Sequence, residues 1–552
     1  MNPAQLLSHF DRISDAPDAI PRLRQFILDL AVRGKLVEQD PRDEPASELL
    51  KCIRAEKVRL VKAGKIKEPQ PLTAIDGTKT PYGIPLSWEW VPLGETVNSH
   101  LGGGTPSKNN SGYWDGDIFW ASVKDVGKGK YIDETIDRIT KAGLADSSSN
   151  LVSPGNLIIV TRMGLGKISI NRVPIAINQD LRALSLSSLS AINYHYIFFK
   201  THGFEGTGLT VKGIRVEELL SIAFPLPPLA EQHRIVAKVD ELMALCDRLE
   251  AAQAEQESRR DRLVASSLNR LNNGANADAF HDHARFYFKH LPRLTTKPEH
   301  IQQLRHSILN LAVRGKLVPQ DRNDRHVRGM DAKKISLSKD CDGHIFNESL
   351  STLNLPSSWG VEPLISVVAA MVDCPHSTPK WANKGRICVR TNQFRPGHLD
   401  LSGSRYVSEK TYADRIQRME PTRNDILYSR EGGILGVACR IPPGVKLCLG
   451  QRMMLIRAGE AITAQFLEMV LNSPFITTIA RTRTTGGAAP RVNVATIKAY
   501  PIPLPPLAEQ QRIVAKVDEL IALCDQLDAQ LINTRTDSRR LLDAVLHYAI
   551  SA

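Results

Sequence analysis

Two stretches of the chain carry apolar residues at alternating steps of four and three positions. The first set is Ile235, Val239, Leu242, Cys246 and Leu249, and the second is Ile513, Val517, Leu520, Cys524, Leu527 and Leu531. This heptad spacing is typical of a helix that packs along another helix. The pattern continues to about Leu271 and Tyr548, which predicts two helices of roughly 40 residues, each about 60 Å long.

The two stretches are copies of one another. Residues 225–250 and 503–528 are identical at 22 of 26 positions, and an upstream pair, 23–40 and 304–321, is identical at 14 of 18. The chain therefore consists of an element, an insert and a second element, repeated once. Such a repeat predicts a pseudo-two-fold arrangement in which the two long helices pair as an antiparallel coiled coil. The alternative is that each long helix packs only on its own domain.

The upstream element predicts a short amphipathic helix in each copy. Leu23, Ile27 and Leu30 form one apolar face, and Gly34 is placed to end the helix. The second copy repeats the pattern and ends at Gly315.

The inserts, residues 86–224 and 357–502, have a different character. Short runs of β-type residues, NLIIVTR, NYHYIFF, DILYSRE and MMLIRAG, alternate with turn residues, which predicts a mixed α/β or α+β fold. The inserts share only short islands: Pro85-Leu-Ser-Trp88 is similar to Pro356-Ser-Ser-Trp359, and Gln179 has a counterpart in Gln451. The inserts therefore have one predicted fold with two diverged surfaces, and the duplicated elements that flank them, here called the frame, are nearly identical. This combination is what the recognition of two different ligands requires.

Basic and small polar residues gather in probable loops of the inserts, at 102–110, 161–167 and 480–491. Arg and Lys neutralise phosphates, small polar groups fix the register on a duplex, and Arg or Asn can read base edges. The glycines fit neither a dinucleotide-binding nor a P-loop motif. The candidate DNA-contacting residues are Gly103, Thr105, Ser107, Lys108, Lys124, Arg162, Lys167 and Lys212 in the first insert, and Arg390, Asn392, Arg430, Arg481, Arg483 and Arg491 in the second.

Composition supports a basic, multidomain protein. The 552 residues include 71 Lys and Arg against 59 Asp and Glu, a net charge of +12 that favours a polyanionic partner. The eight cysteines form no C-x-x-C pair or zinc-type cluster, so we expect neither a disulfide framework nor a metal. No secretory leader or membrane-length apolar run is evident, and we expect a cytoplasmic protein.

Three motifs together resemble the specificity subunits of type I restriction-modification systems, the HsdS family. They are the duplicated PLPPLAEQ block, the duplicated LAVRGKLV block, and the stretch from Gly102 to Val126 that contains GGGTPS and YWDGDIFWASVKDV. The resemblance covers nearly the whole chain. The second insert departs from it, because VDCPHSTPK (372–380) and VRTNQF (389–394) stand where GGTPS is expected, so residues cannot be transferred between the two halves.

This resemblance implies two target-recognition domains, each reading half of a bipartite DNA site, and helices that fix the gap between them. It also implies double-stranded DNA, two methyltransferase subunits and restriction subunits as partners. The chain would bind no cofactor itself, because S-adenosylmethionine serves the methyltransferase and ATP with Mg serves a restriction subunit. The apolar residues of the two heptad patterns, 235–249 and 513–531, would then dock partner helices.

The expected domain order follows from the repeat. A helical region (1–85) precedes target-recognition domain 1 (86–224), a long helix (225–273), a linker with the second helical region (274–356), target-recognition domain 2 (357–502) and a final long helix (503–552). One alternative is a self-contained DNA-modifying enzyme or nuclease, but the Asn-Pro-Pro-aromatic motif of adenine methyltransferases is absent from the sequence. A coiled-coil scaffold without DNA contact is the other alternative, and it leaves the diverged inserts unexplained.

Overall fold

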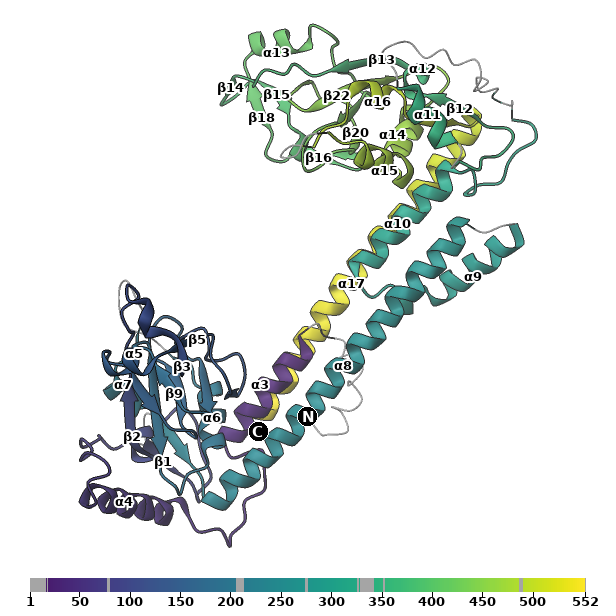
Figure 1. Cartoon of the computed structure of the whole chain (residues 1–552). Helices are drawn as coiled ribbons and strands as arrows, with labels where there is room; N and C mark the ends of the chain where they lie inside the picture. Colours follow the sequence, from purple (N-terminus) through teal and green to yellow (C-terminus); the bar gives the residue numbers. More distant parts are fainter. Residues whose placement is uncertain are drawn as a thin grey trace. The chain divides into compact units, whose positions relative to one another are not determined.

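The structure is a computed structural model that describes residues 16, 18–76, 80–204, 213–273, 277–324, 327, 342–350, 353–485 and 490–551. The chain divides into two compact units. Unit 1 contains residues 1–255 and 535–552, and unit 2 contains residues 256–534. Each unit combines helices with β-sheet (Figure 1), which confirms the mixed fold class.

The first helices in the described part of unit 1 are α3 (Ala19–Val32) and α4 (Ala46–Lys62). Ile27 of α3 is buried, and the helix ends just before Gly34, whose φ of 69° is the left-handed conformation that glycine adopts most easily. A side chain at this position would also collide with the ring of Pro85. The predicted helix and its glycine terminator are confirmed.

The first insert forms two sheets and a two-stranded ribbon. The ribbon pairs β1 (Glu89–Pro92) with β11 (Ala223–Leu226). The larger sheet has the order β2-β10-β7-β8-β4, and the smaller has the order β5-β3-β9-β6. Their bounds are β2 Val97–Gly102, β3 Trp114–Ala121, β4 Tyr131–Ile132, β5 Asp137–Ile139, β6 Asn150–Val152, β7 Leu157–Val160, β8 Ile168–Asn171, β9 Ile175–Ile177 and β10 Leu181–Leu186. Short helices η2 (Leu93–Glu95), η3 (Ser111–Tyr113), α5 (Lys141–Ala145), α6 (Ile192–Thr201) and α7 (Val216–Leu220) connect them.

One predicted strand is wrong. The run NYHYIFF, from Asn193 to Phe199, lies in helix α6, which packs between β8 and α3. Tyr194, Phe198 and Phe199 are all buried there. A short run that is buried on almost every side has no apolar period, so sequence cannot distinguish a strand from a helix.

Unit 2 repeats this architecture in its second insert. The ribbon pairs β12 (Gly360–Pro363) with β23 (Pro501–Leu504), and the two sheets have the orders β13-β22-β19-β20 and β14-β18-β15-β21. The bounds are β13 Val368–Asp373, β14 Trp381–Ala382, β15 Arg386–Val389, β16 Phe394–Arg395, β17 His398–Leu399, β18 Arg405–Val407, β19 Ile426–Ser429, β20 Ala438–Arg440, β21 Leu447–Leu449 and β22 Met453–Ala458. The helices of the insert are α12 Leu364–Val367, η5 Thr391–Gln393, α13 Glu409–Ile416, α14 Ala464–Asn472, α15 Pro474–Thr482 and α16 Val494–Lys498.

The pairing patterns of the two inserts correspond in the central strands of both sheets. The central antiparallel trio β2-β10-β7 has its counterpart in β13-β22-β19, and the parallel pair β3-β9 has its counterpart in β15-β21. The two inserts therefore share one fold, as the sequence islands indicated.

Two 45-residue helices, α8 (Leu229–Asn273) and α17 (Leu507–Ser551), follow the inserts. Helix α8 begins in unit 1 and ends in unit 2, whereas α17 begins in unit 2 and ends in unit 1. Their lengths confirm the prediction of two long helices. The contacts described for the apolar seams of these two helices join residues of the same unit.

In unit 1 the partner of the α8 seam is the short helix α3. Ile235, Val239 and Cys246 belong to the same buried cluster as Ile20 and Ile27. The guanidinium of Arg24 on α3 bonds to Asp247 and Glu250 of α8 at 2.6 and 2.9 Å. The heptad spacing predicted a helix partner, and in this unit the described seam packs on α3. The pairing of the two long helices with each other as an antiparallel coiled coil stays a prediction.

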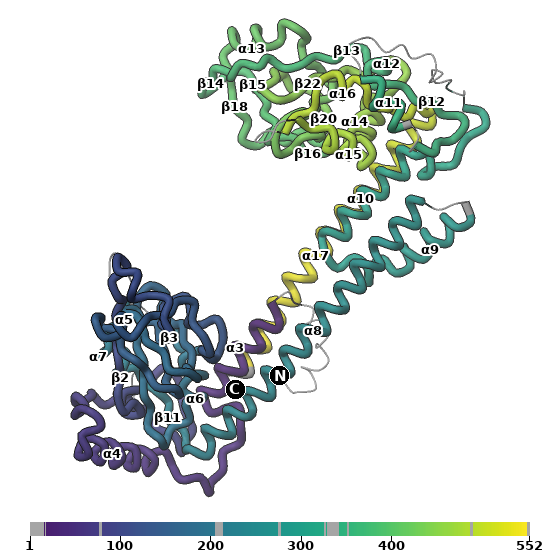
Figure 2. The backbone as a smooth tube through the Cα atoms, viewed as in Figure 1, coloured from purple at the N-terminus to yellow at the C-terminus, as the bar shows by residue number. Residues whose placement is uncertain are grey.

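Unit 2 repeats the contact with α10 (Pro298–Val313) and the first part of α17, which run side by side in Figure 2. Arg305 of α10 bonds to Asp525 and Asp528 of α17 at 2.7 and 2.8 Å. Gly315 ends α10 with a φ of 66° and would collide with Pro356 if it carried a side chain. The two frames are therefore equivalent down to individual ion pairs.

The predicted linker region, residues 274–356, contains two helices besides α10. Helix α9 (Ala277–Leu294) precedes α10 and packs its Tyr287 and Leu294 into the main cluster of unit 2, and α11 (Gly343–Leu350) follows α10 and buries Ile345 and Phe346. No helix in the described part of the chain is long and apolar enough to cross a membrane.

Each insert is fastened to its long helix by the same hydrogen-bonded group, here called the latch. In unit 1 the buried Glu231 of α8 accepts from Trp88 Nε1 at 2.9 Å and from Gln39 Nε2 at 2.5 Å, and Ser87 donates to Gln39. In unit 2 the corresponding residues are Glu509, Trp359, Gln320 and Ser358, with the two bonds to Glu509 at 3.0 and 2.6 Å. The latch explains why Ser-Trp survives in otherwise dissimilar inserts.

Candidate nucleic-acid interface

Strand register places four loops of unit 1 at one edge of its sheets. Gly102 at the end of β2 pairs with Arg182 at the start of β10, and Leu181 pairs with Val160 at the end of β7. Strands β3 and β9 run parallel and end together, at Ala121 and Ile177. The loops that follow these ends are 103–110, 122–130, 161–167 and 178–180, here called the loop cluster of unit 1.

The glycines of loop 103–110 make close contacts within the protein. A side chain on Gly103 would overlap the carbonyl of Ile177, and one on Gly104 would overlap Ser148. Gly103 is therefore required by the approach of the loop to β9. Gly103 was predicted to contact DNA, but in the structure it lies against the protein's own backbone.

Polar contacts join the loops of this cluster to one another. Thr105 Oγ1 donates to Gln179 Oε1 at 2.5 Å, which links loop 103–110 to loop 178–180. Thr161 N donates to the carbonyl of Asp180 at 2.8 Å, and Arg162 lies 3.8 Å from the Asp180 carboxylate. The sequence island around Gln179 is thus a turn that holds two candidate loops together.

Loop 161–167 has a strained backbone. Met163 has a φ of 55° although it is not glycine, and its side chain is 66% exposed. A non-glycine residue in the left-handed region is uncommon and is found most often at turns and functional sites. The following Gly164, also at positive φ, lies against Val123 of loop 122–130.

The exposed cations of the loop cluster outnumber its exposed acids. Lys108, Lys124, Arg162 and Lys167 are all exposed, together with the small polar Ser107. Asp125 and Asp180 are buried, and Asp125 accepts hydrogen bonds from the backbone N–H groups of Ser122 and Ile136. The cluster therefore presents cationic and hydroxyl groups, the combination that binds phosphate and fixes register on a duplex.

Arg182 lies beneath this surface and was missed by the sequence analysis. Its guanidinium covers the position where Gly102 lacks a side chain, and its buried Nε has no hydrogen-bond partner among the described residues. Burial lowers the pKa of Arg182, and Glu217 partly offsets this effect. The signal in the sequence was its position two residues after Asp180, at the start of a strand.

The equivalent strand ends in unit 2 gather loops 374–380, 390–393, 430–437 and 450–452, the loop cluster of unit 2. Gln451 Nε2 donates to the carbonyl of His376 at 2.6 Å, so this pair repeats the link between Thr105 and Gln179. Asn392 is exposed, and Arg390 is half-buried with its Nε lacking a partner.

Arg430 is held inside unit 2. It is 8% exposed, and its guanidinium bonds to both carboxylate oxygens of Asp373 at 3.0 and 2.9 Å, with Glu431 at 3.3 Å. These contacts tie the end of β13 to the end of β19. Its position therefore fits a residue that shapes the loop cluster.

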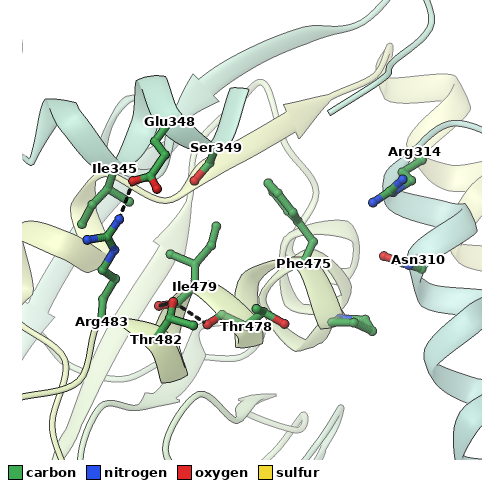
Figure 3. Close-up of a pocket in the computed structure, with 11 residues that line it drawn as sticks. Asn310, Arg314, Ile345, Glu348, Ser349, Phe475, Thr478, Ile479, Thr482 and Arg483 are labelled. Atoms are coloured by element: carbon green, nitrogen blue, oxygen red, sulfur yellow. Dashed lines mark hydrogen bonds and ion pairs between the residues drawn. The ribbon is translucent and has the colours of Figure 1, made fainter. Parts of the chain in front are cut away.

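The arginines of segment 480–491 separate in space. The Arg491 backbone pairs with Glu431, which joins this exposed residue to the loop cluster. Arg483 pairs instead with Glu348 at a pocket of about 370 Å³ between α10, α11 and α15 (Figure 3). Arg481 lies near His306 of α10, where burial and the arginine charge lower the pKa of that histidine.

Arg452 is a further residue that the sequence analysis missed. It is exposed in loop 450–452 with a φ of 67°, and its backbone carbonyl accepts from Arg430 N. Its unit 1 counterpart by position is Asp180, next to the matched Gln179, so the two clusters differ in charge at this point. Of the sequence candidates, Lys212 lies outside the described residues.

A group of possible metal ligands is already neutralised. Glu257, Asp261 and His300 come together in unit 2, but Lys297 Nζ lies 3.1 Å from Glu257 and 3.2 Å from Asp261. His300 Nε2 bonds to Asp261 at 2.7 Å. The lysine supplies the positive charge that a metal ion would bring.

Comparisons with known proteins converge on one family. A family model described as the type I restriction modification DNA specificity domain matches residues 85–257 and 382–534. The chain is 28% identical over 575 residues to the EcoEI type I restriction enzyme specificity subunit of Escherichia coli, covering 96% of this chain and 94% of that protein. It is also 28% identical over 569 residues to the EcoAI specificity subunit of Escherichia coli, with the same coverage. The solved HsdS subunit from Thermoanaerobacter tengcongensis is 17% identical, with a TM-score of 0.42, over 86% of this chain and 99% of that one.

Proposed function

Because the chain belongs to the family of type I restriction-modification DNA specificity subunits, we propose that each of its loop clusters reads one half of a bipartite DNA site. The observation that carries this proposal is the contrast between frame and loops. The latch and the Arg24 and Arg305 ion pairs are the same in both units, whereas the loop residues differ. Two inserts with diverged loop residues, joined to a frame that is the same in both units, are expected of two readers with different target sequences.

The roles of individual side chains follow from exposure. Lys108, Lys124 and Lys167 in unit 1 would neutralise phosphates, while Arg162 would approach base edges from the strained loop. In unit 2 Asn392, Arg452 and Arg491 have the exposure that such contacts need. DNA would therefore meet each unit at the edge where the sheet strands end.

The chain itself would contribute no catalytic group. Its partners would be two methyltransferase subunits, which use S-adenosylmethionine, and restriction subunits, which use ATP and Mg. The repeated frame of α3 with α8 and α10 with α17 offers two equivalent surfaces, and this duplication supports the binding of two copies of one partner.

Mapping methylated adenines tests this function. The chain is expressed with its methyltransferase in cells without other modification enzymes, and the modified sites are sequenced. We expect one bipartite motif, and exchanging residues 86–224 for those of another family member should change only one half of it. Methylation by the purified chain alone, or a motif that ignores the exchange, contradicts the proposal.

A further inference from the structure

A buried arginine holds the loop that follows β13 in unit 2. Arg415 of α13 is 6% exposed and donates to four backbone carbonyls. Nε bonds to Leu449 at 2.6 Å, Nη1 to Ser377 at 3.1 Å, and Nη2 to Pro375 at 3.3 Å and Gly450 at 2.7 Å. One side chain thus ties loop 374–380 to the end of β21.

No carboxylate among the described residues pairs with Arg415, so its charge is met by carbonyl dipoles alone. Charge-assisted bonds of this kind are stronger than neutral ones, and the planar guanidinium fixes their directions. A lysine has one nitrogen and cannot reach carbonyls on two segments in the same geometry. The site is therefore built for arginine.

Other donors complete the arrangement. Arg418 donates to the carbonyl of Asp373 at 3.3 Å, and Gln451 donates to that of His376 at 2.6 Å. Four carbonyls between the end of β13 and Ser377, those of Asp373, Pro375, His376 and Ser377, thereby accept from side chains of the same domain. The side chains of His376, Ser377, Thr378 and Lys380 are exposed.

Unit 1 reaches the same result with different residues. Asn150 Nδ2 donates to the carbonyl of Gly102 at 2.7 Å, Trp120 Nε1 to Gly104 at 3.2 Å, and Trp114 Nε1 to Ser107 at 3.2 Å. Two unrelated sets of donors therefore occupy the carbonyls of the equivalent loop. Local sequence similarity does not account for this agreement, which indicates that the orientation of the loop is what matters.

We propose that Arg415 is a positioning residue for DNA recognition by unit 2: it holds the carbonyls of Pro375 and Ser377, so that the exposed donor side chains of loop 374–380 face the DNA. The chemical target is the acceptors of a duplex, phosphate oxygens and the N7 and O6 atoms of guanine. This inference rests on the proposed function. Arg415 acts through the loop and does not itself contact DNA.

The test uses the full chain assembled with its methyltransferase. Methylation rates are measured on duplexes that carry each single base change in either half-site, for wild type, R415K and K410A. Lys410 is exposed on the same helix and provides the matched control. We expect R415K to reduce discrimination about tenfold in the half-site read by unit 2, the size of a lost base-pair preference, with the other half-site and K410A unchanged.

A second variant keeps the test decisive if R415K does not fold, as judged by circular dichroism. Q451A removes only the bond to the His376 carbonyl and should weaken discrimination in the same half-site. Unchanged discrimination in the folded variants, or an equal loss in both half-sites, overturns the inference. A wild-type complex that methylates no bipartite motif would instead refute the proposed function, so the two failures are distinguishable.

Discussion

Replacing Trp88 by phenylalanine tests the latch in unit 1. The substitution removes the indole N–H that donates to Glu231 at 2.9 Å and leaves that carboxylate oxygen buried with one donor fewer. Trp359→Phe makes the same change beside Glu509, where the bond is 3.0 Å long. The duplicated chain therefore supplies its own matched control.

The expected cost has two parts. Losing a hydrogen bond to a charged buried group costs about 2 kcal/mol. The smaller ring leaves roughly 40 Å³ unfilled, which adds about 1 kcal/mol. Each variant should therefore lose about 3 kcal/mol of local stability, equivalent to ~150-fold faster opening of the structure that the latch secures.

Amide hydrogen exchange, measured by mass spectrometry, reports this loss of local stability for individual peptides. Trp88→Phe should accelerate exchange in peptides from α3 and β11 and leave those from α10 and β23 unchanged, and Trp359→Phe should do the reverse. A change below about fivefold, or acceleration spread evenly over both units, would show that the latch does not carry the stability assigned to it.

Three further predictions concern single sites. Burial raises the pKa of Glu231, so its contribution to stability is present below the ordinary value of 4.5 and is lost as pH rises through the raised value. In thermal melts over this pH range, Glu231→Gln should become more stable relative to wild type as the pH rises. Melting temperatures of the two proteins that change in parallel with pH would contradict this. Gly103→Ala should push the loop from Ile177, cost about 1–3 kcal/mol and abolish reading of one half-site, as methylation mapping would show. Lys108→Ala should lower the slope of log affinity against log salt by about one, while Lys62→Ala on α4 should not, and equal slopes would remove Lys108 from the interface.

Much of the frame was predictable because its signals are local. The heptad seams gave both long helices, and the glycines at 34 and 315 ended the short helices as expected. Strands β7, β19 and β22 matched their β-type runs. The partner of each seam was not predictable, because an apolar stripe does not encode which surface it meets.

The candidate site was harder because its contacts are non-local. Arg430 and Arg491 both stand beside glycine- or proline-containing loops. Arg430 is buried and pairs with Asp373, which lies 57 residues earlier in the chain, whereas Arg491 is exposed. Arg415 gave no signal, since its four acceptors are backbone carbonyls that have no side-chain pattern. The sequence located the loops, and the tertiary contacts decided which of their cations face solvent.

Unit 1 combines segments that are more than five hundred residues apart in the sequence, with Arg22 paired to Asp543 and Asp18 to Arg539. Leu542 lies in the same buried cluster as Ala19 of α3. During translation α3 leaves the ribosome long before these partners are synthesised, so its packing in unit 1 is completed only after unit 2 has emerged.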